Sequence, residues 1–271
     1  MKRVIVIVLF CIMKQNFYCQ TVFSGILLDS LAKTPVEFAN VGIIGKGFGT
    51  VTNDKGEFSL AIPDSLLNET IRVSMLGYKT KVYKARAAKA GITIYLAEDA
   101  NALNEVVVQV KKTKIKMLGN DTKTKHVLGG FKKNSLGSEL AIRLNIKNPQ
   151  TQLRRFLVNI NANSLGLPVF RFNLYNVDGN GMPKENILKQ NIIIEPKQKT
   201  GLIELDLQPY NIYVDDDVFI SIEWIKDLGD VKGLSFSTKL VGSTTYYRLA
   251  SQDQWHKISP VGIGLHAEVA Y

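Results

Sequence analysis

Apolar and polar residues alternate along most of this chain, in short runs separated by Gly, Asn, Asp and Pro. In the first part of the chain such runs lie near 22–28, 37–44, 48–53, 57–62, 70–75, 79–84, 92–96 and 104–110. Alternation with a period of two predicts β-strands that bury one face, and regular spacing with turn residues predicts a sandwich of two sheets. We therefore expect an all-β fold here.

The second part of the chain shows the same period more clearly. One face of the run Leu202–Leu207 carries Ile203, Leu205 and Leu207, and the other carries Glu204 and Asp206. In Val218–Trp224, the residues Val218, Ile220, Ile222 and Trp224 are expected inside, with Ser221 and Glu223 outside. The last run places Ile263, Leu265, Ala267 and Val269 inside, with His266 and Glu268 outside. A jelly-roll-like sandwich of roughly eight strands is the prediction, and an immunoglobulin-like topology is the alternative.

Between the two parts the alternation is lost, and lysines outnumber the single acid Asp121. The predicted organisation is a signal peptide at 1–19, a β-sandwich at 20–110, a basic linker at 111–135 and a jelly-roll-like β-sandwich at 136–271. A solvated linker is the simplest interpretation of the lysine-rich stretch. Contact with anionic lipid or acidic polysaccharide is the alternative.

The N-terminus has the composition of an export signal. Lys2 and Arg3 precede the apolar run Val4–Met13, which is shorter than the roughly 20 residues that a membrane-spanning helix needs. Cleavage is expected near Cys19, although acylation of Cys19 and a non-exported N-terminal strand are alternatives. Cys11 and Cys19 are the only cysteines, so the mature chain forms no internal disulfide. We expect an exported protein of the periplasm, outer membrane or cell surface.

Turn chemistry is strongest in the segment 47–58. Asn53 and Asp54 accept backbone hydrogen bonds and tolerate left-handed backbone, and Gly56 supplies a positive φ. This pattern predicts a compact β-hairpin, and Gly77 is expected to end a later strand.

Several of these segments together resemble a known family. They are Phe23-Ser24-Gly25, the run 34–41, Gly49-Thr50-Val51-Thr52-Asn53-Asp54-Lys55-Gly56-Glu57-Phe58, Leu76-Gly77-Tyr78 and Leu103-Asn104-Glu105-Val106-Val107-Val108. Residues 22–110 are similar to the carboxypeptidase-D regulatory-like domain. This resemblance implies a transthyretin-like seven-stranded sandwich of the kind found at the N-terminus of exported and outer-membrane proteins. The chain after residue 110 is too short for a receptor barrel, and it resembles only uncharacterised β-sandwich tails.

The family name does not imply peptidase activity. A catalytic zinc ion needs three protein ligands, and His126, His256 and His266 show no zinc-ligand spacing. No Ser or Cys stands in a nucleophile elbow. We therefore expect a non-enzymatic protein without a cofactor.

Calcium is the one metal ion for which the sequence offers candidate ligands. Asp178 and Asn180 lie in an Asp-Gly-Asn-Gly turn, and Asp215 and Asp217 precede a strand. Oxygen ligands from two such loops would suit Ca²⁺. The alternative is that these residues only build a hairpin turn and a solvated strand end.

Ligand-binding candidates are aromatic. The two candidates are Trp255, the aromatic residue in a polar run that is expected to be exposed, and Tyr246. Of the adjacent Tyr246 and Tyr247, one should face outward. Packing in the core is the simpler interpretation of these aromatic residues. Trp224 falls on an apolar face and is expected in the core. The alternative function is a glycan-active hydrolase or carbohydrate-binding protein that uses the second sandwich, with catalytic carboxylates among Glu204, Asp206, Glu223 and Glu268.

The net charge of +10 bears on the class of partner. Nucleic acid would fit this charge but not an exported protein. The sequence therefore predicts an exported binding or interaction module whose partner is an envelope protein or a glycan. Peripheral membrane association is possible on this charge, with no transmembrane span after the signal is removed.

Overall fold

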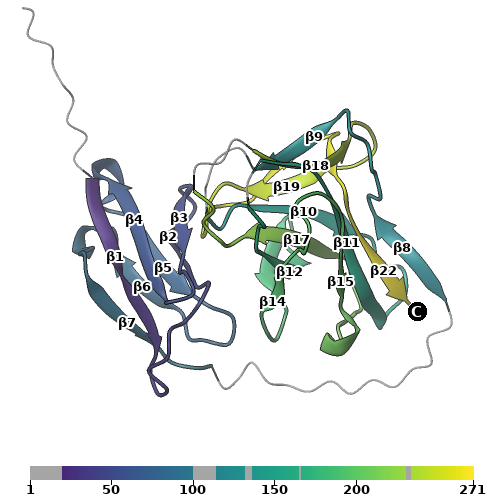
Figure 1. The fold of residues 1–271 in the computed structure, drawn as a ribbon. Helices are drawn as coiled ribbons and strands as arrows, with labels where there is room; N and C mark the ends of the chain where they lie inside the picture. The colour runs from purple at the N-terminus through teal and green to yellow at the C-terminus, as the bar shows by residue number, and fades with distance from the viewer. Residues whose placement is uncertain (1–19, 100–113, 132–135, 165, 230–232) are drawn as a thin grey trace, which may run out of the picture.

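The computed structural model describes residues 20–99, 114–131, 136–164, 166–229 and 233–271, and these residues are almost entirely β-structure. The predicted signal peptide and the predicted strand at 104–110 lie outside this part of the chain. In Figure 1 the strands form two bodies that lie side by side, the first from the N-terminal part of the sequence and the second from the remainder. The all-β prediction with two β-sandwiches is confirmed.

Within the described residues, the first body contains seven strands in two sheets. Its strands are β1 (Gln20–Asp29), β2 (Asn40–Ile43), β3 (Phe48–Val51), β4 (Glu57–Pro63), β5 (Thr70–Ser74), β6 (Lys81–Lys84) and β7 (Ile92–Leu96). One sheet has the order β4-β1-β7 and the other the order β3-β2-β5-β6. Their inner faces enclose one apolar cluster that includes Phe23, Leu27, Val41, Ile71 and Ile94. Alternation along β4, with Phe58, Leu60 and Ile62 buried, shows how the sequence builds this core.

The predicted hairpin at 47–58 is wrong, although its turn is present. Strand β3 pairs with β2 and strand β4 pairs with β1, so the two strands belong to different sheets. The turn closes through a hydrogen bond from Gly56 N to Asn53 O, and Gly56 has a φ of 73°. Thr52 explains the divergence, because its backbone bonds to Phe38 and Ala39 rather than to β4. The turn therefore carries the chain from one sheet to the other.

Two sheets also form the second body. Its strands are β8 (Ile115–Gly119), β9 (Leu128–Phe131), β10 (Glu139–Leu144), β11 (Thr151–Asn163), β12 (Phe170–Val177), β13 (Pro183–Asn186), β14 (Ile192–Ile194), β15 (Gly201–Asp206), β16 (Tyr213–Val214), β17 (Val218–Trp224), β18 (Leu234–Lys239), β19 (Thr245–Arg248), β20 (His256–Ile258), β21 (Gly262–Ile263) and β22 (Leu265–Ala270). A seven-stranded sheet has the order β13-β12-β17-β10-β19-β20, with β14 on β12. An eight-stranded sheet has the order β21-β18-β11-β22-β8, with β15 and β16 on β11 and β9 on β18. This sandwich is therefore larger than the roughly eight strands expected.

A single large apolar cluster fills the space between these sheets. It includes Phe156, Phe172, Ile220, Trp224 and Phe236, all at most 1% exposed. The expected core position of Trp224 is confirmed. Among the described residues, helix is limited to short 3₁₀ turns, η1 (Asp64–Leu66), η2 (Ala85–Ala87) and η4 (Gln208–Tyr210). None of the described segments forms a helix with the length and apolarity to cross a membrane.

The expectation of a linker throughout 111–135 is wrong for two segments. Strand β8 pairs with β22 at the end of the chain, and β9 pairs with β18. Both strands find partners more than a hundred residues away in sequence, which local composition does not reveal. The alternation in Ile115-Lys116-Met117-Leu118 is that of an edge strand, and lysines are typical of exposed edges.

Candidate functional site

A row of four charged residues crosses the outer face of the seven-stranded sheet. Arg171 on β12 lies opposite Glu223 on β17, which lies opposite Glu139 on β10, which lies opposite Arg248 on β19. These residues alternate with core positions such as Phe172 along the same strands, so the period of two directs all four side chains away from the apolar core. The row therefore reads plus, minus, minus, plus across four neighbouring strands.

Burial makes this row unusual. The side chains of Glu139 and Glu223 are 0% exposed, and those of Arg171 and Arg248 are 4% and 12% exposed. The sequence prediction that Glu223 points into solvent is wrong. Its face of the sheet was correctly assigned as the face away from the core, but other parts of the protein cover that face.

Each carboxylate has its own arginine. Arg171 Nε donates to Glu223 Oε2 at 2.9 Å, and Arg248 Nη2 lies 2.5 Å from Glu139 Oε2. Glu223 Oε1 makes no hydrogen bond but lies 3.7 Å from Arg248 Nη2, so Arg248 interacts with both acids. Buried ion pairs of this kind persist only when the charges are paired and hydrogen-bonded.

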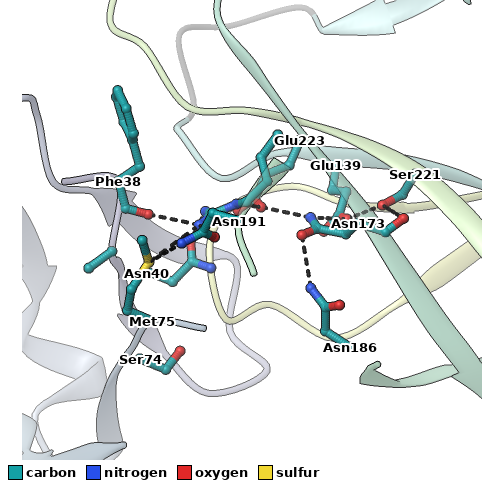
Figure 2. Close-up of polar contacts among 12 residues, drawn as sticks. Phe38, Asn40, Ser74, Met75, Glu139, Asn173, Asn186, Asn191, Ser221 and Glu223 are labelled. Carbon is teal, nitrogen blue, oxygen red and sulfur yellow. Dashed lines mark hydrogen bonds and ion pairs between the residues drawn. The ribbon is translucent and has the colours of Figure 1, made fainter. Parts of the chain in front are cut away.

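Uncharged side chains complete the network. Asn173 Nδ2 donates to Glu139 Oε1 at 2.8 Å and to Glu223 Oε2 at 2.9 Å, so it links the two carboxylates. Tyr175 donates its hydroxyl to Glu139 at 3.0 Å, and Ser221 donates to the same carboxylate. Figure 2 shows Asn173 between Glu139, Glu223 and Asn186. The carboxylate pair is thus enclosed by donors.

The two glutamates have opposite pKa shifts. Burial raises the pKa of Glu139, Arg248 opposes that rise, and the neighbouring Glu223 adds to it. Burial would also raise the pKa of Glu223, but Arg171 and Arg248 together outweigh it, and the pKa is lowered. Glu223 is therefore the firmly ionised member of the pair.

Arg171 extends the network into the first sandwich. Its Nη1 donates to the carbonyl oxygen of Phe38 at 3.0 Å, and its Nη2 donates to Asn40 Oδ1 at 3.3 Å. Met75 Sδ lies 3.7 Å from Nη1, and Asn191 contacts the same atoms from the second sandwich. Figure 2 shows Phe38, Asn40 and Met75 on one side of this contact and Glu223 on the other. One guanidinium therefore joins a buried carboxylate of one sandwich to the backbone of the other.

The acceptor loop on the first sandwich is itself held in place. Phe38 has a φ of 57°, a left-handed conformation that is uncommon for a residue with a side chain. Thr52, which is fully buried, donates its hydroxyl to Val36 O at 2.7 Å and accepts from Ala39 N at 2.8 Å. Thr52 therefore fixes the loop that presents the Phe38 carbonyl to Arg171.

A second contact joins the sandwiches through closely approaching backbone. Gly45 N donates to Gln252 O at 2.9 Å, and Gln252 Nε2 donates to Ser74 Oγ at 2.7 Å. A Cβ atom at Gly42 would lie 2.2 Å from Ser251 O, and one at Gly49 would lie 2.1 Å from it. Glycine is needed at both positions because the loop of the second sandwich rests directly on the β2–β3 backbone.

Apolar side chains fill the space between these polar contacts. Val51 from the first sandwich and Val169 and Ile225 from the second form one buried cluster, against which Phe38, Leu136 and Ile193 pack. We call the Arg171 contacts, the Ser251–Gln252 loop and this cluster together the joint. It is the most extensively built polar site in the described part of the chain.

The predicted calcium residues do not form a cation site in this structure. Asp178 Oδ1 accepts from the backbone of Asn180 and Met182, which closes its own turn. Asp217 pairs with Arg143 at 2.8 Å, and Asp215 accepts from Gln150 N. Arg143 Nη1 would lie 3.6 Å from a Cβ at Gly181, so a guanidinium already lies between the two loops. Among the described residues, no three His, Cys, Asp or Glu side chains converge on a possible metal position.

The predicted aromatic ligand residues are half-buried rather than exposed. The ring of Trp255 packs edge-on against Tyr175 at 5.4 Å, and the Arg248 guanidinium carbon lies 5.2 Å from its centroid. Tyr246 packs edge-on against Phe219 at 4.6 Å. Tyr246 and Trp255 therefore cover the outer face of the sheet beside the charged row, and Tyr247 packs against the core as the alternation predicts.

Of the three other carboxylates proposed for a hydrolase, Glu204 and Glu268 are paired with arginine. Arg155 lies 3.2 Å from Glu204 and also pairs with Glu268, whose pKa this hydrogen bond lowers. Arg155 therefore lies between these two acids, whereas in the buried row the arginines flank the adjacent glutamates. Asp206 accepts from Gln208 N and stays at the surface.

Sequence reasoning missed Arg171, Glu139, Arg248 and Ser251. The available signal was that each of two strands carries two polar residues at alternate positions. These are Arg171-x-Asn173 on β12 and Ser221-x-Glu223 on β17, with one charge of each sign between them. Strands that pair would bring such residues together. Nothing local revealed that a second sandwich would cover them.

Comparison with known proteins identifies the first sandwich only. Residues 23–108 match the family described as the CarboxypepD_reg-like domain. No curated protein matches the chain. Among solved structures, the cysteine protease and lectin-like domains of Cwp84 from Clostridium difficile align at 10% identity with a TM-score of 0.41, over 93% of this chain and 59% of that one.

Two further structures align more weakly. The major pilin subunit BcpA of Bacillus cereus, as its D312A variant, gives 8% identity and a TM-score of 0.21 over 90% of this chain and 69% of that one. The infectious bursal disease virus structure gives 9% identity and a TM-score of 0.28 over 94% of this chain and 67% of that one. At such scores these likenesses support no functional argument. The family match at residues 23–108 agrees with the resemblance found in the sequence at residues 22–110.

Proposed function

We propose that this chain is a non-catalytic binding module of the cell envelope, in which the regulatory-like sandwich and the larger sandwich act as one rigid body. The observation that carries the proposal is the buried charged row. Glu139 and Glu223 are neighbouring carboxylates of the kind a glycan hydrolase would use, but each is 0% exposed and paired with an arginine.

A glycan hydrolase needs two carboxyl groups roughly 5–10 Å apart that both reach the scissile bond. A substrate could reach Glu223 only by displacing Arg171 and separating the two sandwiches, because Arg171 bonds both Glu223 and Phe38. These contacts of Arg171 also account for the buried charges, because they hold the two sandwiches together at the joint. This supports a structural role for them over a catalytic one.

A rigid joint suits a protein that binds through its surface. Domains joined by a small polar interface normally move relative to each other, whereas a large apolar interface restricts that motion. Here the joint combines buried ion pairs, backbone contact and an apolar cluster. Export is proposed from the apolar run after Lys2 and Arg3, and the net charge of +10 favours an anionic component of the envelope as the partner.

The test of the rigid body is ¹⁵N relaxation on the purified chain from residue 20 to residue 271. We expect amides of both sandwiches to report one rotational correlation time. The Arg171→Met variant should give two different times, and the surface variant Lys184→Met should behave as the natural chain. Separate times in the natural chain would contradict the proposal.

The test of the non-catalytic assignment is turnover. The purified chain should release no product from peptide, peptidoglycan or polysaccharide substrates. Glu223→Gln and Glu139→Gln serve as controls, since any turnover that both variants abolish would assign catalysis to this pair and overturn the proposal.

Carbohydrate binding is the second candidate, favoured by the half-exposed rings of Trp255 and Tyr246 beside the charged row. Stacking on such rings is how many proteins recognise sugar. A glycan array should then show binding that Trp255→Ala removes. Tyr95→Ala, at a 41% exposed ring on the first sandwich, is the matched control.

A further inference from the structure

The loop between β18 and β19 exposes apolar side chains where the chain crosses from one sheet of the second sandwich to the other. Among the described residues, Leu240 and Val241 are the one pair of large apolar residues that are consecutive in sequence and both exposed, at 55% and 70%. Gly242 has a φ of 83°, and a Cβ there would meet nothing within 4 Å. The loop 240–244 therefore turns in open solvent.

A second loop, between β20 and β21, lies against the first. Strands β19 and β20 pair with each other, and Thr244 Oγ1 donates to Ser259 Oγ at 3.2 Å. Ile258, at the end of β20, is 48% exposed. We call the segments 240–244 and 258–261 together the tip. Three exposed apolar side chains thus lie in two loops that are bonded to each other.

Lysines flank the tip on both outer faces of the sandwich. Lys239 follows the inward-facing Thr238 at the end of β18, so it faces outward from the eight-stranded sheet. Lys257 pairs with Tyr246, which covers the outer face of the seven-stranded sheet. Both lysines are exposed. Because a lysine has a long flexible stem, its ammonium group can reach from either face toward the plane of the tip.

The segment 120–127 adds positive charge beside the tip. Asn120 at its start donates to Gly262 O at 2.7 Å, and Val127 at its end accepts from the backbone of β18 at 3.0 Å. Both ends are therefore fixed next to the strands that carry the tip. The exposed charged residues between them are Asp121, Lys123 and Lys125.

This combination of apolar side chains and lysines fits the surface of an anionic bilayer. The tip and its flanking segments carry four lysines and one acid. Proteins that bind such surfaces bury apolar side chains at the level of the headgroups and attract anionic lipid through basic residues. A stable protein partner would need a matching surface of about 800 Å². A fluid bilayer accepts two short loops without matching their shape.

We propose that the tip inserts Leu240, Val241 and Ile258 into the headgroup region of a bilayer that contains anionic lipid, while the flanking lysines contact lipid phosphates. Strand β19 runs from the tip to Arg248 in the charged row, and the loop that follows it contacts the first sandwich. The joint is therefore at the other end of β19 from the bilayer. The tip gives the proposed binding module a surface and a partner, so this inference rests on the proposed function.

The experiment is cosedimentation of the purified chain from residue 20 to residue 271 with vesicles. One set is phosphatidylcholine alone, and the mixed set has equal parts of phosphatidylcholine and phosphatidylglycerol. We expect binding to the mixed set only, and weaker binding as added salt screens the lysines. Leu240→Ser with Val241→Ser should weaken binding about tenfold or more. Leu31→Ser with Val82→Ser, at 83% and 61% exposed positions of the first sandwich, is the matched control and should bind as the natural chain does.

A second pair of variants tests the charge. Lys239→Gln with Lys257→Gln should weaken binding to the mixed vesicles about fivefold for each lysine removed. Lys55→Gln with Lys89→Gln removes the same charge from exposed positions of the first sandwich. This control should change binding by less than about twofold, because its lysines lie far from the bilayer compared with the screening length of salt.

A fluorescent label tests the site without depending on a loss of binding. The chain from residue 20 contains no cysteine, so Val241→Cys provides a single labelling position. A nitrobenzoxadiazole label at that position should shift its emission to the blue when mixed vesicles are added, because the label enters a less polar medium. The same label on the Val82→Cys variant should not shift.

Absence of binding to the mixed vesicles, or equal binding to the neutral ones, would overturn the proposal. So would vesicle binding that leaves the label at position 241 unshifted, since the contact would then lie elsewhere on the protein. A shift caused by a lipid-free extract of envelope proteins but not by vesicles would assign the tip to a protein partner instead. The relaxation and turnover tests use no lipid, so a failed vesicle test leaves the rigid joint and the non-catalytic assignment in place.

Discussion

Arg171 Nη1 lies 3.0 Å from the carbonyl oxygen of Phe38, a residue 133 positions earlier in the chain. The same guanidinium donates through Nε to Glu223, which has no exposed side-chain surface. A single side chain therefore satisfies a buried acid in one sandwich and a backbone acceptor in the other. The stability of the second sandwich and the geometry of the joint depend on the same residue.

Replacing Arg171 with methionine should affect both properties. The variant keeps an apolar stem but leaves Glu223 without its nearest cation, and removing one partner of a buried pair costs about 3–5 kcal/mol. Denaturant unfolding should show this loss, and amide exchange should accelerate at residues 38–40. Lys184→Met removes an exposed pair with Glu185 and should change stability by less than about 0.5 kcal/mol. Equal effects of the two variants would show that the Arg171 contacts do not stabilise the protein.

Opposite pH dependence is expected for the two buried glutamates. The folded state lowers the pKa of Glu223, so its contribution to stability is present above the unfolded pKa and is lost as the pH falls through the folded pKa. The folded state raises the pKa of Glu139. The contribution of Glu139 to stability is therefore present below its unfolded pKa and is lost as the pH rises through its folded pKa. Glu223→Gln should therefore cost more at pH 7 than at pH 4, and Glu139→Gln should cost less.

Denaturant titrations of both variants and the natural chain at the two pH values measure these differences. The natural chain is the reference at each pH, which removes the contribution of all other titrating groups. If both variants changed in the same direction with pH, the assignment of Glu223 as the firmly ionised member would be incorrect.

Gly42 and Gly49 should be sensitive to the smallest possible side chain. A Cβ at either position would lie within 2.2 Å of Ser251 O, so the loop must move away. Overpacking of this kind costs about 1–3 kcal/mol. We expect Gly42→Ala and Gly49→Ala to lower the melting temperature and to expose amides 249–253 to exchange. Gly179→Ala is the control because nothing lies within 4 Å of its Cβ, and a matching response there would argue against the loop contact.

Gly56 lies in the turn that carries the chain between the two sheets, and Gly45, which follows β2, is its matched control. They have φ values of 73° and 67°, so alanine is strained at both by about 1–2 kcal/mol. A Cβ at Gly56 would lie 2.5 Å from Leu27 O, whereas at Gly45 nothing lies within 4 Å. Gly56→Ala should therefore be the more destabilising variant by about 1–3 kcal/mol in thermal or chemical unfolding. If both variants lost the same unfolding free energy, the backbone at Leu27 would have to move away from the new Cβ at no energetic cost.

Much of the fold follows from alternation and turn chemistry. Ile203 and Leu207 are buried and Glu204 and Asp206 are exposed, as their period of two predicts. The turn at Asn53 is also encoded locally, since Asn53 Oδ1 accepts from the backbone of Lys55 and Glu57. The sheet that each flanking strand joins is not encoded locally, because it depends on the bonds that Thr52 makes to residues 36–39.

The joint was not predictable in the same way. Alternation assigns Glu223 to the face away from the core, but it does not indicate what covers that face. Gly42 and Gly49 have no positive φ, so turn chemistry gives no reason for them, and their role is visible only once Ser251 is in place. Strand β8 was missed because its partner β22 is at the other end of the second sandwich's sequence.

The charged row also selects the alignment of the strands that carry it. A slip of β12 or β17 by one residue would turn Arg171 or Glu223 into the apolar interior, where an unpaired charge is very unfavourable. A slip by two residues would keep the faces but place Arg171 opposite Ser221 instead of Glu223. Apolar residues alone would discriminate less against that second error, since it exchanges Phe170, Phe172 and Leu174 for one another and all three are large and apolar. The buried charges therefore favour the native register, because a misaligned sheet would bury unpaired charges, a penalty that apolar side chains do not impose.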